Sequence, residues 1–147
     1  MELKIFRTDR TVPLPQHMSE GASGVDLYAS LKEPAVLEPG EYRCISAGII
    51  ISLPFGFEAQ IRPRSGLAAR HGVTVLNTPG TVDSDYRGEV KVILINHGSI
   101  PFTVRPGMRI AQLVVCSIQR VRVVELSSRE EAGSTDRDSG GFGHTGV

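Results

Sequence analysis

Short runs of β-branched and other apolar residues recur about every ten residues along most of this chain, and this spacing restricts the fold more than any other feature. Apolar runs of this length, bounded by turn residues, are typical of strands rather than helices. The predicted strands are 35–37, 42–53, 56–61, 73–76, 90–96, 100–104, 109–118 and 121–126. Evenly spaced short strands predict an all-β fold, an antiparallel jelly roll or distorted barrel.

Proline–glycine turns separate several of these strands. Proline presets φ at one turn position, and glycine supplies a positive φ at the next. The three turns of this kind are Glu38-Pro39-Gly40, Thr78-Pro79-Gly80 and Arg105-Pro106-Gly107. A single helix of about two turns is predicted over residues 65–72, with Ser65 as its N-cap and Gly72 at its C-terminus.

The charges exclude some partners. The 147 residues carry 16 Lys+Arg and 16 Asp+Glu, so no broad basic surface is available to bind nucleic acid, although a small anion remains a candidate ligand. No apolar stretch is long enough for a signal peptide or a membrane span, and we expect no membrane partner. Cys44 and Cys116 lie in apolar runs without metal-ligand spacing, and we expect them to be buried, reduced thiols of a cytoplasmic protein.

The composition changes near residue 127. Residues 1–126 contain the predicted barrel domain, whereas residues 127–147 are rich in Gly, Ser, Asp and Arg and cannot bury a core of their own. We expect a flexible C-terminal arm. Composition alone indicates a disordered tail, but Phe142, framed by glycines, also fits a segment that becomes ordered over a ligand.

Two segments have the chemistry of phosphate binding. In the first, Arg64, Ser65 and Gly66 stand at the start of the predicted helix, where backbone N–H groups favour an anion; a simple cap beside solvated arginines is the alternative. The second, 141–146, formally matches GxGxxG, but no helix can follow it, so a dinucleotide-binding fold is rejected. With Arg137 upstream, its glycines resemble a phosphate clamp.

Three further polar positions interrupt apolar surroundings. Asp83 follows Val82 at a strand end, where a partly desolvated carboxylate can act as a base, although a solvated hairpin tip is the alternative. Asp26 lies in a loop of small residues, and Gln112 interrupts the run 109–118 unless it simply faces outward. Tyr86 is an exposed aromatic residue in the same hairpin as Asp83.

Taken in order, five segments resemble the trimeric dUTP pyrophosphatase (dUTPase) family. They are ASGVDLYA at 22–29, PRSGLA at 63–68, NTPGTVDSDYRGE at 77–89, RIAQLV at 109–114 and GGFGHTG at 140–146. Two departures are Met108, where many members have an acidic residue, and Asp138-Ser139, where a glycine often follows the arginine. The first affects a structural contact, and the second could stiffen the arm.

The resemblance implies a homotrimer of jelly-roll subunits that hydrolyses dUTP to dUMP and diphosphate with Mg²⁺. That activity would supply dUMP for thymidylate synthesis and keep uracil out of DNA. It also implies three active sites between subunits, each closed by the arm of a neighbouring chain.

The family's residue roles carry over position by position. The resemblance implies that Asp83 is the base that activates water, that Gln112 positions this water and that Asp26 holds the hydrated metal through its waters. Ser65 would lie near the bridging oxygen of the leaving group. The residues that would bind the phosphate chain are Arg64, Ser65 and Gly66.

The remaining matches concern the nucleoside and the arm. Tyr86 would pack on the deoxyribose and leave no room for a 2′-hydroxyl, and Arg137 would reach the γ-phosphate. The uracil and sugar pocket would be lined by Asn77, Thr81, Val82 and the backbone near Lys91. Phe142 would stack on uracil, and the clamp would be completed by Gly143, His144 and Thr145.

Two other functions fit parts of the sequence. A related dCTP deaminase would rely on a glutamate in the pocket, whereas this hairpin carries Asp83, and no zinc-deaminase HxE motif is present. A catalytically silent nucleotide-binding barrel would need neither Asp83 nor Gln112. Assays of ammonia release from dCTP and of diphosphate release from dUTP distinguish the three.

Overall fold

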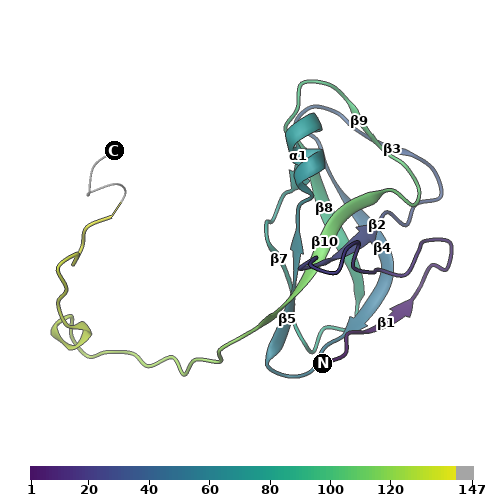
Figure 1. Cartoon of the computed structure of the whole chain (residues 1–147). Coiled ribbons are helices and arrows are strands. Elements are labelled where there is room, and N and C mark those ends of the chain that lie inside the picture. Colours follow the sequence, from purple (N-terminus) through teal and green to yellow (C-terminus); the bar gives the residue numbers. More distant parts are fainter. Residues whose placement is uncertain (142–147) are drawn as a thin grey trace.

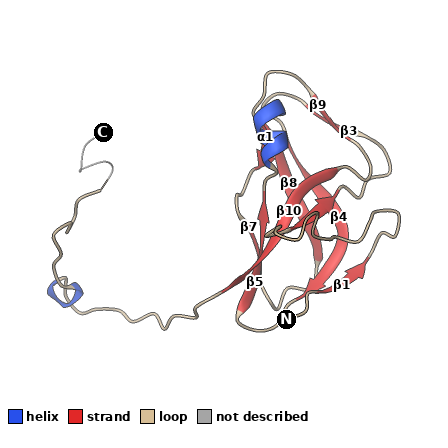
Figure 2. Ribbon diagram, in the orientation of Figure 1, coloured by secondary structure: helices blue, strands red, loops and turns tan. Residues whose placement is uncertain are grey.

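Ten strands, one α-helix and a short 3-10 helix make up residues 1–141, the part of the chain that the structure, a computed structural model, describes (Figures 1 and 2). The helices are α1 (Ser65–His71) and η1 (Glu130–Ala132). The strands are β1 (Lys4–Arg7), β2 (Val25–Tyr28), β3 (Ala35–Leu37), β4 (Tyr42–Ser52), β5 (Phe57–Arg62), β6 (Val73–Val75), β7 (Gly80–Val82), β8 (Glu89–Asn96), β9 (Phe102–Val104) and β10 (Arg109–Ser117).

The strands form two four-stranded antiparallel sheets, with the orders β1-β4-β8-β6 and β2-β10-β5-β7, and β3 pairs separately with β9. Figure 2 shows the two sheets as layers of one sandwich. This arrangement confirms the predicted all-β jelly roll with one short helix. Strand β1 was not predicted. Strand β7 ends at Val82, where the sequence indicated a strand end, and β2 begins within the small-residue segment that was predicted as a loop.

Alternating burial along the strands builds the core between the sheets. On β8, Val90, Val92 and Leu94 are buried, while Lys91 between them is exposed. The other sheet contributes buried residues from its central strands, including Ala59, Ile61, Ile110 and Leu113. Burying one large aliphatic side chain stabilises the fold by about 1.5–3 kcal/mol, so the period-two pattern fixes the register of each strand.

Helix α1 forms where it was predicted, but Ser65 is not its N-cap. Arg64 occupies that position in an extended conformation, and its carbonyl accepts bonds from the N–H groups of Leu67 and Ala68, both at 3.1 Å. Ser65 is therefore already the first helical residue. Gly72 ends the helix in the left-handed conformation (φ 66°), as expected of a C-terminal glycine.

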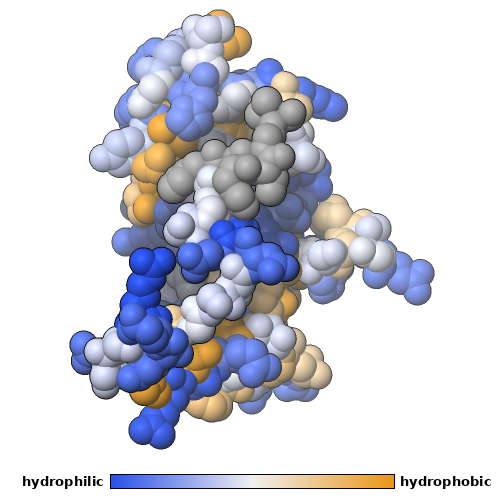
Figure 3. All heavy atoms as spheres, turned by 90° about the vertical axis from the view of Figure 1, so that its left-hand side faces the viewer, coloured by the Kyte–Doolittle hydropathy of each residue, from blue (hydrophilic) through white to orange (hydrophobic). Residues whose placement is uncertain are grey.

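The predicted strand at 121–126 is wrong, since the sheets end at Ser117 and no strand is present at these residues. The chain leaves the body after β10, so no other strand of this chain lies beside it to satisfy its backbone groups (Figure 1). Val121 and Val123 are consequently 79% and 89% exposed. Figure 3, seen from the side on which this segment projects, shows hydrophobic patches of the body that also stay exposed.

The structure also differs from two smaller predictions, which concern a turn glycine and the two cysteines. Gly40 and Gly107 have positive φ as predicted, but Gly80 does not, because it begins β7 opposite Ile61, and the turn before it contains a cis Thr78–Pro79 bond. Cys44 is exposed rather than buried, because the first three residues of β4 all face solvent, and Cys116 is half-buried.

Asn96 is the one buried polar or charged residue of the described chain, and its amide joins three segments. Its Nδ2 donates to the carbonyls of Leu37 (2.9 Å) and Ile100 (2.8 Å), and its Oδ1 accepts from the N–H of Gly98 (2.8 Å). We predict that Asn96→Leu lowers the free energy of unfolding by about 3 kcal/mol, because three backbone groups lose the hydrogen bonds that this buried amide makes with them. Thermal unfolding at fixed protein concentration measures this loss. The same change at exposed Asn77 is the control, and equal effects at both positions would contradict the prediction.

Candidate active site

Five of the predicted site residues gather around one pocket at the end of the sheet β2-β10-β5-β7. The pocket has a volume of about 260 Å³. We call it the arginine pocket, and its lining is Met18, Ala22, Gly24, Asp26, Arg64, Ser65, Gly66, Arg109 and Gln112. Asp26 comes from β2, Gln112 from β10, and Arg64 to Gly66 from the junction of β5 with α1.

The carboxylate of Asp26 forms ion pairs with both arginines of this pocket. Asp26 Oδ1 lies 3.4 Å from Nε of Arg64, and Asp26 Oδ2 accepts a bond from Nη1 of Arg109 at 3.0 Å. The Asp26 side chain is only 12% exposed, so this pairing is screened less than an ion pair in free solvent. Arg64 Nη1 also donates to the carbonyl of Arg109 (3.2 Å). The three groups together have a net positive charge, which suits an oxyanion.

Gln112 joins the same cluster through the backbone. Its Cα is paired with Asp26 on one side and with Arg62 on the other, and its Nε2 donates to the carbonyl of Pro63 at 3.1 Å. The side chain therefore points along the pocket wall towards the residues that precede α1. Gly24 packs closely against the same strand, because a Cβ there would lie 2.9 Å from the carbonyl oxygen of Leu113 and 3.4 Å from Oε1 of Gln112. This close approach explains why a small residue precedes Val25 and Asp26.

A second, smaller pocket lies between β7 and β8. It has a volume of about 180 Å³, we call it the hairpin pocket, and it is lined by Thr81, Val82, Asp83, Tyr86, Glu89, Val90 and Lys91. The turn is closed by Tyr86 N–H, which donates to the carbonyl of Asp83 at 3.2 Å, and by Arg87 Nη1, which donates to the carbonyls of Ser84 and Tyr86. The Tyr86 side chain is 46% exposed, as expected from the sequence.

Asp83 is exposed, so the expected partial desolvation of this carboxylate is wrong for the single chain. The reason is its place directly after β7, the edge strand of its sheet, where no further strand of this chain covers it. Its neighbours Val82 and Ser84 are both half-buried.

The two pockets are separated within one chain. Val82 pairs with Ala59 on one edge of β5, whereas Gln112 pairs with Arg62 on the other edge. Three residues along a strand span about 10 Å, and two strand spacings add about as much across the sheet. The side chains of Asp83 and Gln112 in the same chain are therefore too far apart to contact one water molecule.

Other predicted residues lie outside both pockets. Asn77 is exposed in the turn before β7, and Arg137 lies on the projecting segment, where its Nε donates to the carbonyl of Gly140 at 2.8 Å. The segment that follows β10 extends away from the body (Figure 1). The residues predicted to complete the clamp lie outside the described part of the chain; they are Phe142, Gly143, His144 and Thr145.

Two charged residues of these pockets were not predicted as site residues from the sequence. Arg109 is paired with Asp26 in the arginine pocket, and Glu89 lines the hairpin pocket. Arg109 was read only as the first residue of an apolar strand. The signal that was available is its charge at the start of a buried run, since a strand end is where a charged side chain reaches the surface.

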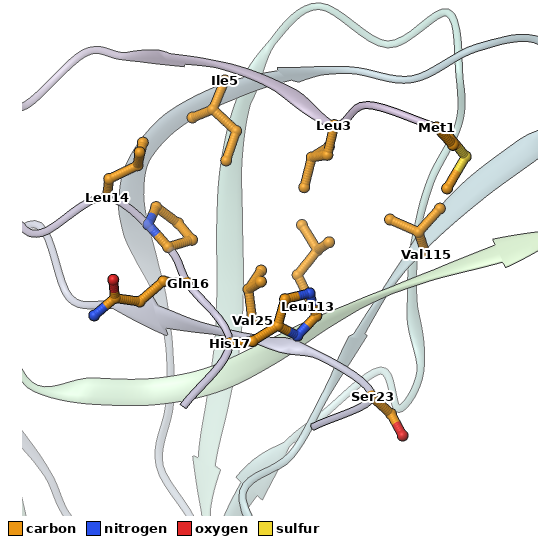
Figure 4. A pocket seen from close by; sticks show the side chains of 11 residues that line it. Met1, Leu3, Ile5, Leu14, Gln16, His17, Ser23, Val25, Leu113 and Val115 are labelled. Carbon is orange, nitrogen blue, oxygen red and sulfur yellow. The ribbon is translucent and has the colours of Figure 1, made fainter. Parts of the chain in front are cut away.

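An apolar cavity of about 620 Å³ lies on the other side of the same strands (Figure 4). Val25 and Leu113 line it, whereas their strand neighbours Asp26 and Gln112 line the arginine pocket, because successive side chains point to opposite faces. Among residues 1–141, the lining of this cavity includes no Asp, Glu, Lys or Arg. The polar side chains of its lining are Gln16, His17 and Ser23, so this cavity has less positive charge to offer a phosphorylated ligand than the arginine pocket.

The described residues hold no all-protein metal cluster and no membrane-spanning helix. Residues 1–141 contain no group of three or more His, Cys, Asp or Glu side chains placed to hold a metal ion, and both oxygens of Asp26 face arginines. A metal that is held mainly by a ligand's phosphates, with Asp26 near its waters, fits this donor set better than an all-protein site. No helix within the described residues is long and apolar enough to cross a bilayer.

Comparison of the whole chain with known proteins points to one family. The sequence model of the dUTPase family matches residues 10–146. The deoxyuridine 5′-triphosphate nucleotidohydrolase of Thermoanaerobacter sp. (strain X514) is 56% identical over 147 residues, covering 99% of this chain and 97% of the relative. The protein of the same name from Caldanaerobacter subterraneus subsp. tengcongensis is 55% identical over 147 residues, with the same coverage.

Solved structures show the same fold. A dUTPase mutant of Staphylococcus bacteriophage 80alpha with dUpNHpp has a TM-score of 0.87 at 21% identity, covering 99% of each chain. A dUTPase mutant from phage phi11 of S. aureus, whose structure describes a structural Mg(II) ion, has a TM-score of 0.78 at 19% identity, covering 88% of this chain and 99% of that one. At these identities the likeness supports the fold alone.

The net positive charge of the arginine pocket indicates that a short polyphosphate binds there. We expect Arg109→Ala to weaken the binding of inorganic tripolyphosphate about tenfold or more, because one charge-assisted contact and the partner of Asp26 are lost together. Isothermal titration calorimetry in magnesium-free buffer measures this affinity. Arg70→Ala, which changes an arginine of α1 outside the pocket, is the control. Equal affinities for the two variants would remove Arg109 from the site.

Proposed function

This chain belongs to the dUTPase family and is a dUTP diphosphatase, and we propose how it works: water attacks the α-phosphorus of dUTP and releases dUMP and diphosphate. The observation that carries the proposal is the convergence of Asp26, Arg64, Ser65, Arg109 and Gln112 on one pocket. The product dUMP would serve thymidylate synthesis, and removal of dUTP would keep uracil out of DNA. We propose the cytoplasm as its location.

The arginine pocket would bind the phosphate chain. Arg64 and Arg109 are held by Asp26, so their remaining N–H groups are already oriented when the ligand arrives. Ser65 and Gly66 would bind the phosphates beside them, with Ser65 near the oxygen that bridges to the leaving diphosphate. Mg²⁺, when bound to the phosphates, neutralises part of their charge, and Asp26 would contact it through its waters.

Asp83 would accept the proton of the attacking water, and Gln112 would hold that water in line with the α-phosphorus. The oxygen of the water forms the new bond to phosphorus while the bond to the bridging oxygen breaks, so the products are dUMP and diphosphate. Because water attacks the phosphorus directly and Asp83 takes only its proton, no covalent enzyme intermediate is formed.

The hairpin pocket would bind the nucleoside. As the edge strand of its sheet, β7 has backbone groups along one side that pair with no strand of the described chain, and Thr81 and Val82 lie on it. Uracil presents an acceptor, a donor and an acceptor, which such an edge can match together with the backbone near Lys91 and the side chain of Asn77. Cytosine would place its amino donor opposite a donor and its N3 acceptor opposite an acceptor, at a cost of about 1–3 kcal/mol for each unpaired group. Tyr86 would pack on the deoxyribose.

We propose that the complete site lies between chains of a homotrimer. The separation of Asp83 from Gln112 within one chain supports this, because the reaction requires both at one water molecule. The exposed Val121 and Val123 also indicate a partner for the segment after β10. Residues 127–147 of a neighbouring chain would form the arm, with Arg137 on the γ-phosphate and Phe142 on uracil. Gly143, His144 and Thr145 would complete the clamp.

We predict that Asp83→Asn retains dUTP binding but slows turnover by about 10²–10⁴-fold, because the amide cannot accept the proton of water. Diphosphate release from dUTP measures turnover, and calorimetry with dUpNHpp measures binding. Asp85→Asn alters a neighbouring exposed carboxylate of the same hairpin and is the matched control. Near-normal turnover by Asp83→Asn would disprove the role of this base. A panel of dUTP, dTTP, dCTP and UTP tests the substrate.

A mixing experiment tests the shared site. We predict that Asp83→Asn and Arg64→Ala chains, each inactive alone, regain activity when they are co-expressed with different tags and purified as mixed oligomers. In a cyclic trimer of both variants, one of the three interfaces combines an intact Asp83 with an intact Arg64, so activity should reach about a third of the wild-type value. Mixed oligomers no more active than their parents would place both residues in one chain's site.

A further inference from the structure

Glu89 connects the hairpin pocket with a polar cavity on the neighbouring face. This residue begins β8 and lines both the hairpin pocket and a cavity formed around Asp9, Ser30 and Ser46. Its carboxylate Oε1 accepts a hydrogen bond from the hydroxyl of Thr8, which follows β1. The N-terminal segment of the chain is thereby attached to the hairpin that carries Asp83 and Tyr86.

Thr8 is itself held firmly in place. Its N–H and that of Asp9 both donate to the carbonyl of Gly48, at 2.9 and 3.2 Å. Gly48 has a φ of 65° and lies where the pairing of β4 with β8 shifts register between Ser46 and Ile50. The Asp9 carboxylate accepts bonds from the hydroxyls of Ser30 and Thr11, both at 2.6 Å.

These hydrogen bonds favour the charged form of the Asp9 carboxyl. The hydroxyl of Ser30, followed by the hydroxyl and N–H of Thr11, holds the pKa of the Asp9 carboxyl below its ordinary value. The Asp9 carboxylate therefore stays charged while it accepts the bonds of Ser30 and Thr11, and it takes no part in the bond between Thr8 and Glu89.

The same residue also holds the aromatic side chain of the hairpin. The hydroxyl of Tyr86 donates to the backbone carbonyl of Glu89 at 3.2 Å. The Tyr86 ring folds back against Gly88, where even a Cβ would collide with the ring carbons and the hydroxyl. Glu89 thus contacts Tyr86 through its backbone and Thr8 through its side chain.

We propose that Glu89 is a positioning residue: held by Thr8, it fixes Tyr86 at the distance from the sugar that excludes a 2′-hydroxyl. This rests on the proposed function, in which Tyr86 packs on the deoxyribose. A loosened Glu89 lets the Tyr86 ring move away from Gly88, and space for a ribose opens. Selectivity for deoxyribonucleotides therefore depends on the hydrogen bond between Thr8 and Glu89, although Tyr86 is the side chain that packs on the sugar.

The test compares dUTP with UTP. In Thr8→Val, which keeps the shape and removes the hydroxyl, we expect the ratio of kcat/KM for dUTP to that for UTP to fall about tenfold, while kcat for dUTP changes less than about twofold. Thr8→Ser keeps the hydroxyl and should retain the wild-type ratio. Glu89→Gln, which weakens the acceptor, should lower the ratio like Thr8→Val. Calorimetry of dUMP and UMP binding gives a readout that does not depend on turnover.

Thr11→Val is the matched control, because it removes a hydroxyl of the same segment that bonds to Asp9 rather than to Glu89. A wild-type ratio in Thr8→Val, or an equal fall in Thr11→Val, would overturn the role of Glu89 while dUTP hydrolysis by the wild-type enzyme still stood. Failure of the proposed function would look different, since the wild-type enzyme would then not release diphosphate from dUTP. A wild-type enzyme that accepted UTP as readily as dUTP would instead remove the role of Tyr86.

Discussion

The double pairing of β10 is the constraint on which the rest of the structure depends. This strand is hydrogen-bonded to β2 on one side and to β5 on the other, and Gln112 stands opposite Asp26 and Arg62 at once. Segments that are far apart in the sequence are thereby brought to one edge of a sheet. The arginine pocket is a consequence of this register, because Asp26, Arg109 and the residues after β5 can meet only when the three strands are aligned in this way.

The arrangement of charges in the arginine pocket follows from the free-energy cost of removing the Asp26 carboxylate from water. An isolated buried carboxylate is unfavourable, and two guanidinium groups compensate Asp26 on both of its oxygens. The whole chain has a formal net charge of zero, yet the pocket has more positive than negative side chains. A neutral protein can therefore bind a compact polyanion without a broad basic surface that attracts nucleic acid.

Local sequence patterns correctly predicted the elements whose conformation depends on neighbouring residues. They failed for features that depend on contacts between segments far apart in the sequence. The strands at 35–37 and 90–96, the helix after Arg64 and the turns at Gly40 and Gly107 follow from periodicity and backbone preference. The strand at 121–126 has the right residues but no partner in the chain, and strand formation requires one. The roles of Arg109 and Glu89 depend on contacts with Asp26 and Thr8, which lie more than eighty residues away in the sequence, so no local motif could show them.

The alternation along β10 also limits how the segment can change length. Leu113 faces an apolar cavity and Gln112 the arginine pocket, so inserting or deleting a single residue upstream in the strand would exchange their faces. An amide would then enter an apolar space, and a leucine would face the arginines. Indels in this strand are thus tolerated only in pairs or where a β-bulge absorbs the extra residue, as the irregularity between Arg109 and Ala111 already does.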